Sequence, residues 1–403
     1  MERIIFHIDV NSAYLSWSAV EKRRLDPESV DLRTIPSIIG GDRESRHGVV
    51  LAKSAPAKKY KIQTGEPISQ ALKKCPFLVI EPANHRLYRQ FSDKFMGFLR
   101  TLTDQIEQVS IDECYLDFTH IAHRYESPRA AADYIRRTIF EFFGFTVNVG
   151  ISSNKLLAKM ASDFEKPDKT HTLFPGEIKK KMWPLPVSDL YMAGRASVEI
   201  LQKLEIMTIG DLAKADPDML ALHLKSHGRL LWEYANGIDD TPLESEPAQA
   251  KGIGNSVTLP RDLTTVAEAK NVLKQLADRV ASRLRHSGQC ASSICVEIKY
   301  HTFVSVSHQM AIHTPTSSDE IIYQHACTLF DALWDQTPIR LLGIRTTKLS
   351  SEDEPVQMNL FDIDMKEIEK SRKLEKLENA LKQVRGKYGE DIIHRGIDCR
   401  ENP

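Results

Sequence analysis

The sequence predicts a multidomain α+β protein, and three observations support that class. The chain has 403 residues, which is too long for one ordinary domain and favours roughly two to four. Hydrophobic residues make up 41% and charged residues 27%, as in globular proteins rather than disordered or fibrous ones. Strand-like and helix-like segments are mixed in two regions, which a helical stretch and a polar linker separate.

Residues 1–170 predict a mixed sheet with helices. Apolar runs rich in Val, Ile and Phe indicate strands, and apolar residues at helical spacing indicate helices. The expected strands lie within 4–9, 47–54, 105–118 and 145–153, and the expected helices span 85–103, 128–144 and 154–166. This β-α-β-β-α-β order is typical of a split α+β sheet of ferredoxin type. The insertion between the first strand and about residue 80 would form a separate lobe.

The rest of the chain predicts a helical region, a linker and a second α+β unit. From Pro184 to about Gly237, Leu, Ile and Ala recur at helical spacing. The polar stretch DDTPLESEPAQAK, with two prolines and several acids, is typical of an interdomain linker. Strand and helix patterns return within 254–263, 267–288, 292–312 and 339–350. An acidic segment and a Lys/Glu-rich helical tail follow, and the sequence has no internal repeat.

Composition argues against several classes of protein. No apolar run approaches the ~20 residues that a membrane span needs, and the N-terminus has no basic leader. The six cysteines are scattered without CxxC pairs or zinc spacing, which suits a reducing compartment. We therefore expect a cytoplasmic protein without membrane contact. The net charge of −1 does not indicate a nucleic-acid partner, so such a surface would have to arise from segregated charges.

Two adjacent carboxylates, Asp112 and Glu113, stand within the strand-like run QVSIDECYLDF. Buried charges are costly unless something compensates them. Asp9 ends the opening strand, so pairing of that strand beside the run would gather three carboxylates at one sheet edge. Divalent cations relieve such repulsion, and two Mg²⁺ ions roughly 3.5–4 Å apart would support an in-line phosphoryl transfer. The alternative is that the acidic pair only caps an exposed β-turn.

Three segments together carry a resemblance to a known family. HIDVNSAYLSWSAVE, QVSIDECYLDF and VNVGISSNKLLAKMASDFEKPD, in this order, resemble the Y-family DNA polymerases, and most closely the bacterial DNA polymerase IV group. The match extends to about residue 350. It implies a ferredoxin-like palm, a small fingers lobe, a helical thumb with a helix-hairpin-helix, and an α+β little finger. The implied ranges are 1–11 and 80–173 for the palm, 12–79 for the fingers, 174–237 for the thumb, 238–250 for a linker, 251–350 for the little finger and 351–403 for the tail.

The resemblance implies a metal site. Asp9, Asp112 and Glu113 would bind two Mg²⁺ ions together with the main-chain carbonyl of Val10. Glu113 would also lie near the primer 3′-hydroxyl. Many relatives carry Asp where this chain has Asn11, and that change removes a nearby negative charge but no required metal bond.

The resemblance also implies a nucleotide site. Tyr14 would be the steric gate that excludes a 2′-hydroxyl, and Lys58 and Lys166 would contact the triphosphate. From the residues alone, Tyr14 also fits a buried helix aromatic, and Lys166 fits a solvated surface lysine. Family members often have Tyr and Arg where this chain has Ala55 and Lys58. Lys58 keeps the positive charge but loses the planar fork of arginine.

Contacts to DNA are implied in the thumb and the little finger. In LYMAGRASVEILQKLEIMTIGDLA, which is similar to a helix-hairpin-helix, a turn at Gly194 and Arg195 would bring backbone amides to a phosphate. Glu205 stands where relatives commonly have glycine. Residues 251–350 hold eleven Lys or Arg against eight Asp or Glu. The expected contacts there are Gly252, Gly254, Arg340 and Arg345. The alternatives are an ordinary helical connector and a solvated charged face.

The acidic segment near residue 360 contains a short apolar motif, QMNLF. Neighbouring exposed Leu and Phe side chains are costly unless they meet an apolar pocket. The motif resembles the clamp-binding peptide of bacterial polymerases. Gln357, Leu360 and Phe361 would therefore bind the sliding clamp.

The sequence as a whole favours a template-directed DNA polymerase that adds dNTPs to a primer on template DNA and acts as a monomer. The chain has no spare segment for a proofreading exonuclease, and its fingers insertion is small, so we expect low fidelity and translesion synthesis. Two rival hypotheses stay open. A nucleotide cyclase would use the same sheet, but the thumb-like region and the clamp motif argue against it. A catalytically weakened DNA- and clamp-binding scaffold fits Ala55 but not the complete carboxylate set.

Overall fold

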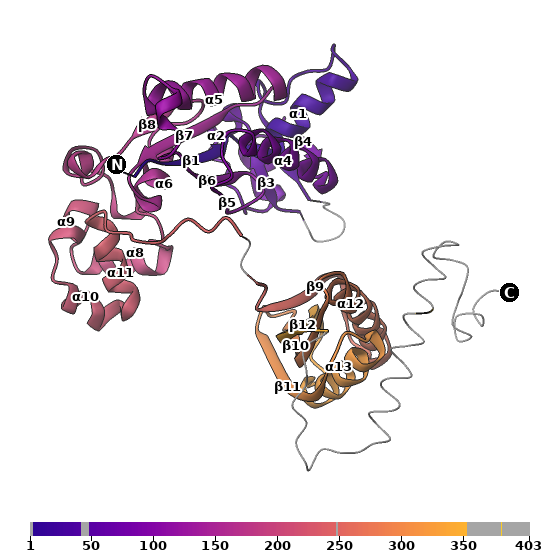
Figure 1. Ribbon diagram of the computed structural model, residues 1–403. Helices are drawn as coiled ribbons and strands as arrows, with labels where there is room; N and C mark the ends of the chain where they lie inside the picture. The colour runs from indigo at the N-terminus through magenta and orange to yellow at the C-terminus, as the bar shows by residue number, and fades with distance from the viewer. Residues whose placement is uncertain (1–2, 42–47, 247–248, 353–379, 381–403) are drawn as a thin grey trace. The chain divides into compact units, whose positions relative to one another are not determined.

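The computed structural model describes residues 3–41, 48–246, 249–352 and 380 (Figure 1). The chain divides into two compact units at the boundary between Ala248 and Gln249. The first unit holds a mixed sheet with helices, a small inserted lobe and a helical region, and the second holds one sheet with two helices. In the described part of the chain, no helix combines the length and the apolar character that a bilayer span requires.

The main sheet of the first unit has the strand order β5-β6-β1-β7-β8. Strand β1 is antiparallel to both β6 and β7, whereas β8 runs parallel to β7. The strands are β1 (Ile5–Val10), β5 (Ile106–Gln108), β6 (Glu113–Asp117), β7 (Val147–Ser152) and β8 (Thr170–Thr172). The helices beside them are α4 (His85–Arg100), α5 (Pro128–Phe143) and α6 (Lys155–Asp163). The split α+β sheet expected from the sequence is confirmed.

Alternation along β1 sends its side chains to opposite faces of the sheet. Its even-numbered residues pack in the main core with α4 and α5, whereas Ile5 packs with Tyr115 and with Ala158 of α6. Figure 1 shows α5 and α6 on different sides of the strands. Gly150 in β7 permits the close approach of α6, because a Cβ there would lie 2.0 Å from the Ala158 carbonyl oxygen. Asp9, two positions beyond His7 on the same face, is therefore directed to the α6 side.

The insertion forms a lobe with its own small sheet, in the order β3-β2-β4. Helix α1 leads into it, and α2 and α3 cover the sheet with a separate apolar core. The bounds are α1 (Ala13–Leu25), β2 (Ser37–Gly40), β3 (Val50–Lys53), α2 (Ala55–Lys58), α3 (Ile68–Lys74) and β4 (Val79–Pro82). Strand β3 lies within the strand expected at 47–54, whereas β2 and β4 are not among the strands that the sequence predicts.

A helical region follows β8, and its core includes residues of α6. The helices are α7 (Ile178–Lys181), α8 (Arg195–Lys203), α9 (Ile209–Lys214), α10 (Pro217–Leu224) and α11 (Ser226–Ala235). The polar stretch after α11 lies partly on the main sheet: the Glu244 amide donates to Glu107 at 2.9 Å, and Leu243 packs on the Ile5 and Tyr115 side. This part of the linker sequence is thus anchored to the first unit.

The second unit is one antiparallel sheet with two helices. Its strand order is β11-β10-β12-β9. The elements are β9 (Gly252–Leu263), α12 (Val266–His286), β10 (Gln289–Tyr300), β11 (Ser305–Thr316), α13 (Asp319–Leu333) and β12 (Ile339–Ser351). Buried side chains of the strands form one core with α12 and α13. Strand residues such as Glu297 and Arg345 are exposed and line a cavity of about 400 Å³.

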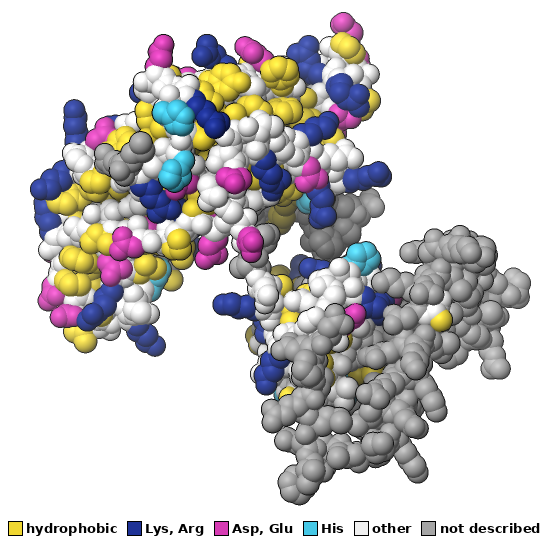
Figure 2. Space-filling model, viewed as in Figure 1, with side chains coloured by type: hydrophobic (Ala, Val, Ile, Leu, Met, Phe, Trp, Pro, Cys, Tyr) yellow, Lys and Arg dark blue, Asp and Glu magenta, His cyan; other side chains and the backbone are white. Residues whose placement is uncertain are grey.

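The outer surface of α5 is rich in exposed aromatic side chains, namely Tyr134, Phe140 and Phe142. Figure 2 shows hydrophobic side chains gathered over this helix at the top of the view. Acidic and basic side chains are interspersed elsewhere on the visible face of the first unit. The net charge of the chain is −1, and on this face of the first unit the positive and negative side chains are mixed rather than segregated.

Candidate active site

Strand pairing brings the three sequence-selected carboxylates together. In the β1–β6 register, Asp9 is the partner of Glu113. The Val10 amide donates to the Asp112 carbonyl at 3.0 Å, which places Asp112 at the same sheet edge. Asp9 and Asp112 both line one cavity. The expected convergence is therefore present, and metal binding by these residues stays a prediction.

The acidic pair borders a turn between two strands. Strand β5 ends at Gln108, β6 begins at Glu113, and Val109 between them is exposed. The Ser110 hydroxyl donates to the Asp112 carboxylate at 2.7 Å. The Ser110 hydroxyl oxygen also accepts hydrogen bonds from the backbone amides of Asp112 and Glu113, at 3.3 and 3.2 Å. Such side-chain bonds favour a turn, so the pair both borders a turn and faces Asp9.

Two lysines neutralise the carboxylates from the α6 side. Lys159 lies 2.9 Å from Glu113 and 3.7 Å from Asp9, and Lys166 lies 2.5 Å from Asp9. Asp163 pairs with Lys159 at 3.5 Å and with Lys166 at 2.8 Å. Burial opposes the charged form of both lysines, but the carboxylates around them raise the pKa of each. In this arrangement the described residues contain no group of three His, Cys, Asp or Glu side chains that could hold a metal ion.

The carboxylates differ in their affinity for protons. The Nε2 of buried His7 lies 3.4 Å from Glu113, and contact with His7 and Lys159 lowers the pKa of Glu113 to about 2. Burial raises the pKa of Asp112, and the charges of Asp9 and Glu113 raise it further. Asp112 is therefore a carboxylate whose ionised form a nearby cation would stabilise.

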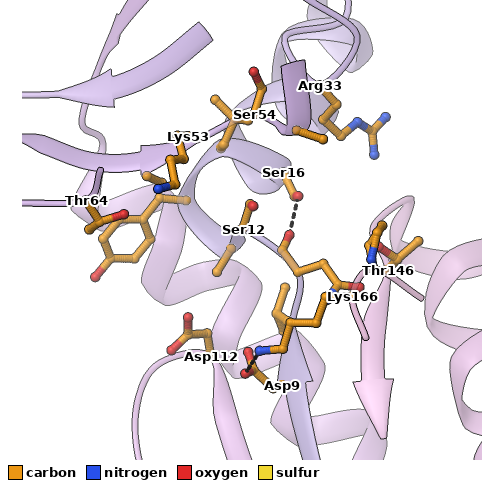
Figure 3. Close-up of a pocket in the computed structure, with 18 of the residues that line it drawn as sticks. Asp9, Ser12, Ser16, Arg33, Lys53, Ser54, Thr64, Asp112, Thr146 and Lys166 are labelled. Atoms are coloured by element: carbon orange, nitrogen blue, oxygen red, sulfur yellow. Dashed lines mark hydrogen bonds and ion pairs between the residues drawn. The ribbon is translucent and has the colours of Figure 1, made fainter. Parts of the chain in front are cut away.

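A cavity of about 620 Å³ opens between these carboxylates and the inserted lobe (Figure 3). Asp9, Asp112 and Lys166 lie at one end of it, and Lys53 lies at the other, beside Thr64. Tyr14 and Lys58 also line the cavity. The carboxylates at one end could bind metal cations, and the lysines that line the cavity could bind a polyanion. The cavity is therefore suited to a polyanion that binds together with metal cations.

Tyr14 lines the cavity near the start of α1. Its ring stacks on Tyr88 with centroids 4.3 Å apart and planes 8° from parallel. Trp17, three residues later on the same helix, is fully buried in the core, whereas Tyr14 is only partly buried. Burial raises the pKa of Tyr14, and the charge of Asp112 adds to this effect. The ring therefore presents a fixed wall to the cavity, and its role as a gate stays a prediction.

Lys58 ends α2, and Ala55 begins it. The Ser54 hydroxyl caps this helix by accepting the Ala57 amide at 3.1 Å, so the helix forms although the tyrosine common in the family is missing. Lys58 lines the cavity, as the triphosphate assignment requires. Contact of Lys58 with a nucleotide stays a prediction.

Two further cations of the cavity are not recognisable in the sequence. Arg33 is held by the Asp31 carboxylate and donates to the Gly144 carbonyl at 2.6 Å. Lys53 donates to the Ile62 carbonyl at 2.6 Å, and burial lowers its pKa. Both belong to the inserted lobe: Lys53 ends β3, within the strand expected at 47–54, and Arg33 lies in a turn before β2, and no motif in the sequence assigns either of them to the site.

Asn11 links the end of β1 to the loop that carries Lys166. Its amide nitrogen donates to the Asn148 side chain at 3.1 Å, and its amide oxygen accepts the Asp168 amide at 2.9 Å. An aspartate could accept but not donate here. The departure from the family pattern therefore has a structural role that the sequence alone did not reveal.

The residues chosen for DNA contact in the helical region are accessible. Gly194 precedes α8, and Gly194 and Arg195 are exposed. Arg195 pairs with Glu199 at 2.9 Å in an exposed ion pair, which contributes little stability. Glu205 has a φ of 60°, in the left-handed region that favours glycine. A glycine would adopt this conformation without strain, which agrees with the glycine that the resemblance leads one to expect there.

The glycines chosen in the second unit allow β9 to pack closely on β12. A Cβ at Gly252 would lie 2.5 Å from the Thr346 carbonyl oxygen, and one at Gly254 would lie 3.1 Å from that of Ile344. Arg345 is exposed on β12 and lines the same cavity as Gly254. Arg340 is half-buried at the start of β12. The clamp residues Gln357, Leu360 and Phe361 lie outside the described residues.

Comparisons with known proteins agree with this architecture. The model of the impB/mucB/samB family matches residues 8–163, and that of the impB/mucB/samB family C-terminal domain matches residues 250–360. The chain is 45% identical to a DNA polymerase IV of Clostridium acetobutylicum over 398 residues, covering 98% of each chain. It is 36% identical to a DNA polymerase IV of Acetivibrio thermocellus, again covering 98% of each. The solved structure of a Y-family DNA polymerase chimera matches with a TM-score of 0.74 at 23% identity, over 88% of this chain and 100% of that one, and supports the fold.

Proposed function

Because the chain belongs to the impB/mucB/samB family of Y-family DNA polymerases and is a DNA-directed DNA polymerase, we propose that it works by two-metal phosphoryl transfer with Mg²⁺. Polymerases of this family are metal-dependent, and their substrates are primer-template DNA and dNTPs. The observation that carries the proposal is the β1–β6 register, which sets Asp9 beside Glu113 with Asp112 at the same edge. We further propose that synthesis is of low fidelity and serves to copy damaged templates.

The donor set suits Mg²⁺, which prefers oxygen ligands and keeps several of its waters. Asp9, Asp112, Glu113 and the Val10 carbonyl would hold the ions. Asp112 supports this fit because its pKa is raised by burial and by neighbouring negative charge. Bound there, the metal ions would activate the primer hydroxyl and stabilise charge on the transferring phosphate.

The chain's own side chains would bind and orient the nucleotide. Lys166 would exchange its contact with Asp9 for one with the triphosphate, and Lys58 would contact the phosphates from α2. As Lys166 moves, Lys159 would stay paired with Asp163, and Asp163 would remain a partner for the Lys166 ammonium group. The Tyr14 ring, held against Tyr88, would pack against the sugar and leave no room for a 2′-hydroxyl.

Primer extension by the full chain tests the proposed function and separates it from its rivals. We expect dNTP-dependent lengthening of a primer with Mg²⁺, both on an undamaged template and past an abasic site. Chelation with EDTA should stop both reactions, and added Mg²⁺ should restore them. Binding of DNA without any extension would favour the scaffold hypothesis, and release of a cyclic nucleotide from a nucleoside triphosphate alone would favour the cyclase.

We propose that the structural regions take the roles of the family's domains, in a chain that acts as a monomer. The main sheet would be the palm, the inserted lobe the fingers, residues 174–237 the thumb and residues 251–350 the little finger, with 238–250 as linker. Each unit would supply its own DNA contacts: backbone amides near Gly194 and Arg195 in the first, and Gly252 and Gly254 with the arginines of β12 in the second. Exposure of Arg345 supports its part in those contacts.

Removal of residues 357–361 should separate basal synthesis from clamp stimulation. We propose that Gln357, Leu360 and Phe361 bind an apolar pocket of the sliding clamp. The deletion should therefore leave extension without the clamp unchanged and abolish the stimulation that the clamp gives in a running-start assay. Met358→Ala with Asn359→Ala is the matched control and should keep the stimulation. Stimulation that persists in the deletion variant would remove the clamp assignment.

A further inference from the structure

The turn between β10 and β11 holds an aromatic ring in solvent. Phe303 is 62% exposed and its neighbour Val304 is 57% exposed, whereas Tyr300 at the start of the turn is buried. Phe303 has a φ of 67°, which is uncommon for a bulky residue. Its amide donates to the Tyr300 carbonyl and the Tyr300 amide donates to the Val304 carbonyl, both at 2.9 Å. The backbone therefore fixes the ring outside the core.

Two cations from neighbouring strands lie against this ring. The Arg340 guanidinium carbon of β12 is 4.6 Å from the ring centroid, and the Lys299 ammonium of β10 is 5.9 Å from it. The loop before β12 joins the turn, because the His301 amide donates to the Pro338 carbonyl at 3.0 Å. A carboxylate in that loop, Asp335, accepts the Thr337 amide at 3.0 Å. The aromatic ring and two positive charges thus form one small surface.

This surface has the chemistry of a single-stranded nucleic-acid platform. An aromatic face stacks with an unpaired base whatever its sequence, and adjacent cations contact the flanking phosphates. An internal base of a duplex offers no free face to such a ring, because both of its faces are stacked on neighbouring bases. An apolar protein partner would find a single ring and one valine beside two charged groups, so charge complementarity favours a polyanion.

We propose that Phe303, with Lys299 and Arg340, stacks an unpaired base of the template strand. The inference rests on the proposed polymerase function, which requires a single-stranded template ahead of the primer. It adds a base-stacking contact to the phosphate contacts proposed for Arg340. The strand that follows the turn, from Ser305 on, lines the same cavity as Gly254 and Arg345, so the platform adjoins the proposed DNA surface.

Equilibrium binding by the full chain tests the platform. The probes are a primer-template with a single-stranded 5′ template overhang and the same duplex with blunt ends, followed by fluorescence anisotropy. Phe303→Ala should weaken binding of the overhang probe by about five-fold or more, the effect of losing one stacked base, and leave the blunt probe unchanged. Val304→Ala is the matched control, since Val304 is similarly exposed but has no ring, and should change neither affinity.

Phe303→Trp supplies a second measurement. It should restore binding of the overhang probe. A single-stranded oligothymidylate should quench its indole fluorescence, measured as the difference from the unaltered chain, which has four tryptophans of its own. The proposal is overturned if Phe303→Ala keeps the affinity for the overhang, if it weakens both probes equally, or if the indole emission does not change. Extension by the unaltered chain is measured in parallel: its failure would contradict the proposed function, whereas extension with unchanged binding by Phe303→Ala would overturn only the platform.

Discussion

Asp112→Asn is expected to abolish primer extension while DNA binding is retained. The asparagine keeps the size of the side chain and can still accept from the Ser110 hydroxyl, so the turn should survive. It removes a negative charge at the sheet edge that Asp9 and Glu113 share. Loss of one preorganised electrostatic contact typically costs about 10²–10³-fold in rate, and we expect a loss of at least this size in kcat. Single-turnover extension with saturating primer-template measures it.

Asp117→Asn is the matched control for this experiment. Asp117 lies on the same strand, β6, but pairs with Arg3 at 3.5 Å and belongs to the other end of the strand. Its replacement should leave extension close to that of the unaltered chain. Normal extension by Asp112→Asn, with both variants equally folded by circular dichroism, would remove the carboxylate site from the mechanism.

Tyr14→Ala is expected to admit ribonucleotides. The Tyr14 ring is fixed by its stack on Tyr88 and lines the cavity near Asp112, so a 2′-hydroxyl would have to displace a packed ring. Overpacking of this kind costs about 1–3 kcal/mol, which corresponds to about 5- to 150-fold in discrimination. We therefore expect the ratio of kcat/KM for dNTP over rNTP to fall by that factor, mainly through a gain with rNTP.

Tyr14→Phe separates the ring from its hydroxyl. It keeps the aromatic wall and should preserve the discrimination against ribonucleotides. A ratio that is unchanged in Tyr14→Ala would contradict the gate, and a ratio lost equally in Tyr14→Phe would assign the discrimination to the hydroxyl instead. Thermal unfolding of both variants checks that they stay folded at the assay temperature although the stack of Tyr14 on Tyr88 is altered.

The main sheet could be predicted from the sequence because its strands carry clear local signals. The run ending at Asp9 and the run around Tyr115 are rich in strand formers, and their pairing follows once a split α+β sheet is recognised. The acids at their ends then converge by topology. The same reasoning could not locate the turn at Ser110, since Val109 and Ile111 continue an alternating pattern across it.

The positive side of the site could not be predicted in this way. Lys159 reaches Glu113 because α6 lies close on the odd-numbered face of β1, and that approach depends on Gly150. Arg33 reaches the cavity from a turn of the inserted lobe, and Lys53 reaches it from the end of β3; the strand signal at 47–54 predicts the strand but not the cavity that this side chain lines. Contacts between residues distant in the chain depend on tertiary packing, which a single sequence does not specify residue by residue.

The lysine contacts explain why the carboxylates tolerate one another before metal binds. Lys159 and Lys166 neutralise Asp9 and Glu113. Asp163 pairs with both lysines, so an ammonium group that leaves Asp9 would still have a carboxylate partner. The proposed mechanism therefore requires metal and nucleotide to displace Lys166 from Asp9. The scaffold hypothesis requires no such exchange, so counting bound metal ions separates the two.

The most direct test of the central claim is the number of divalent ions bound at the carboxylates. Mn²⁺ can be titrated by electron paramagnetic resonance into the full chain with a dideoxy-terminated primer-template and a matching dNTP, where no bond can form. The account predicts about two bound ions per chain, and fewer in Asp112→Asn but not in Asp117→Asn. Binding that is absent from the unaltered chain, or that is the same in Asp112→Asn, would contradict it.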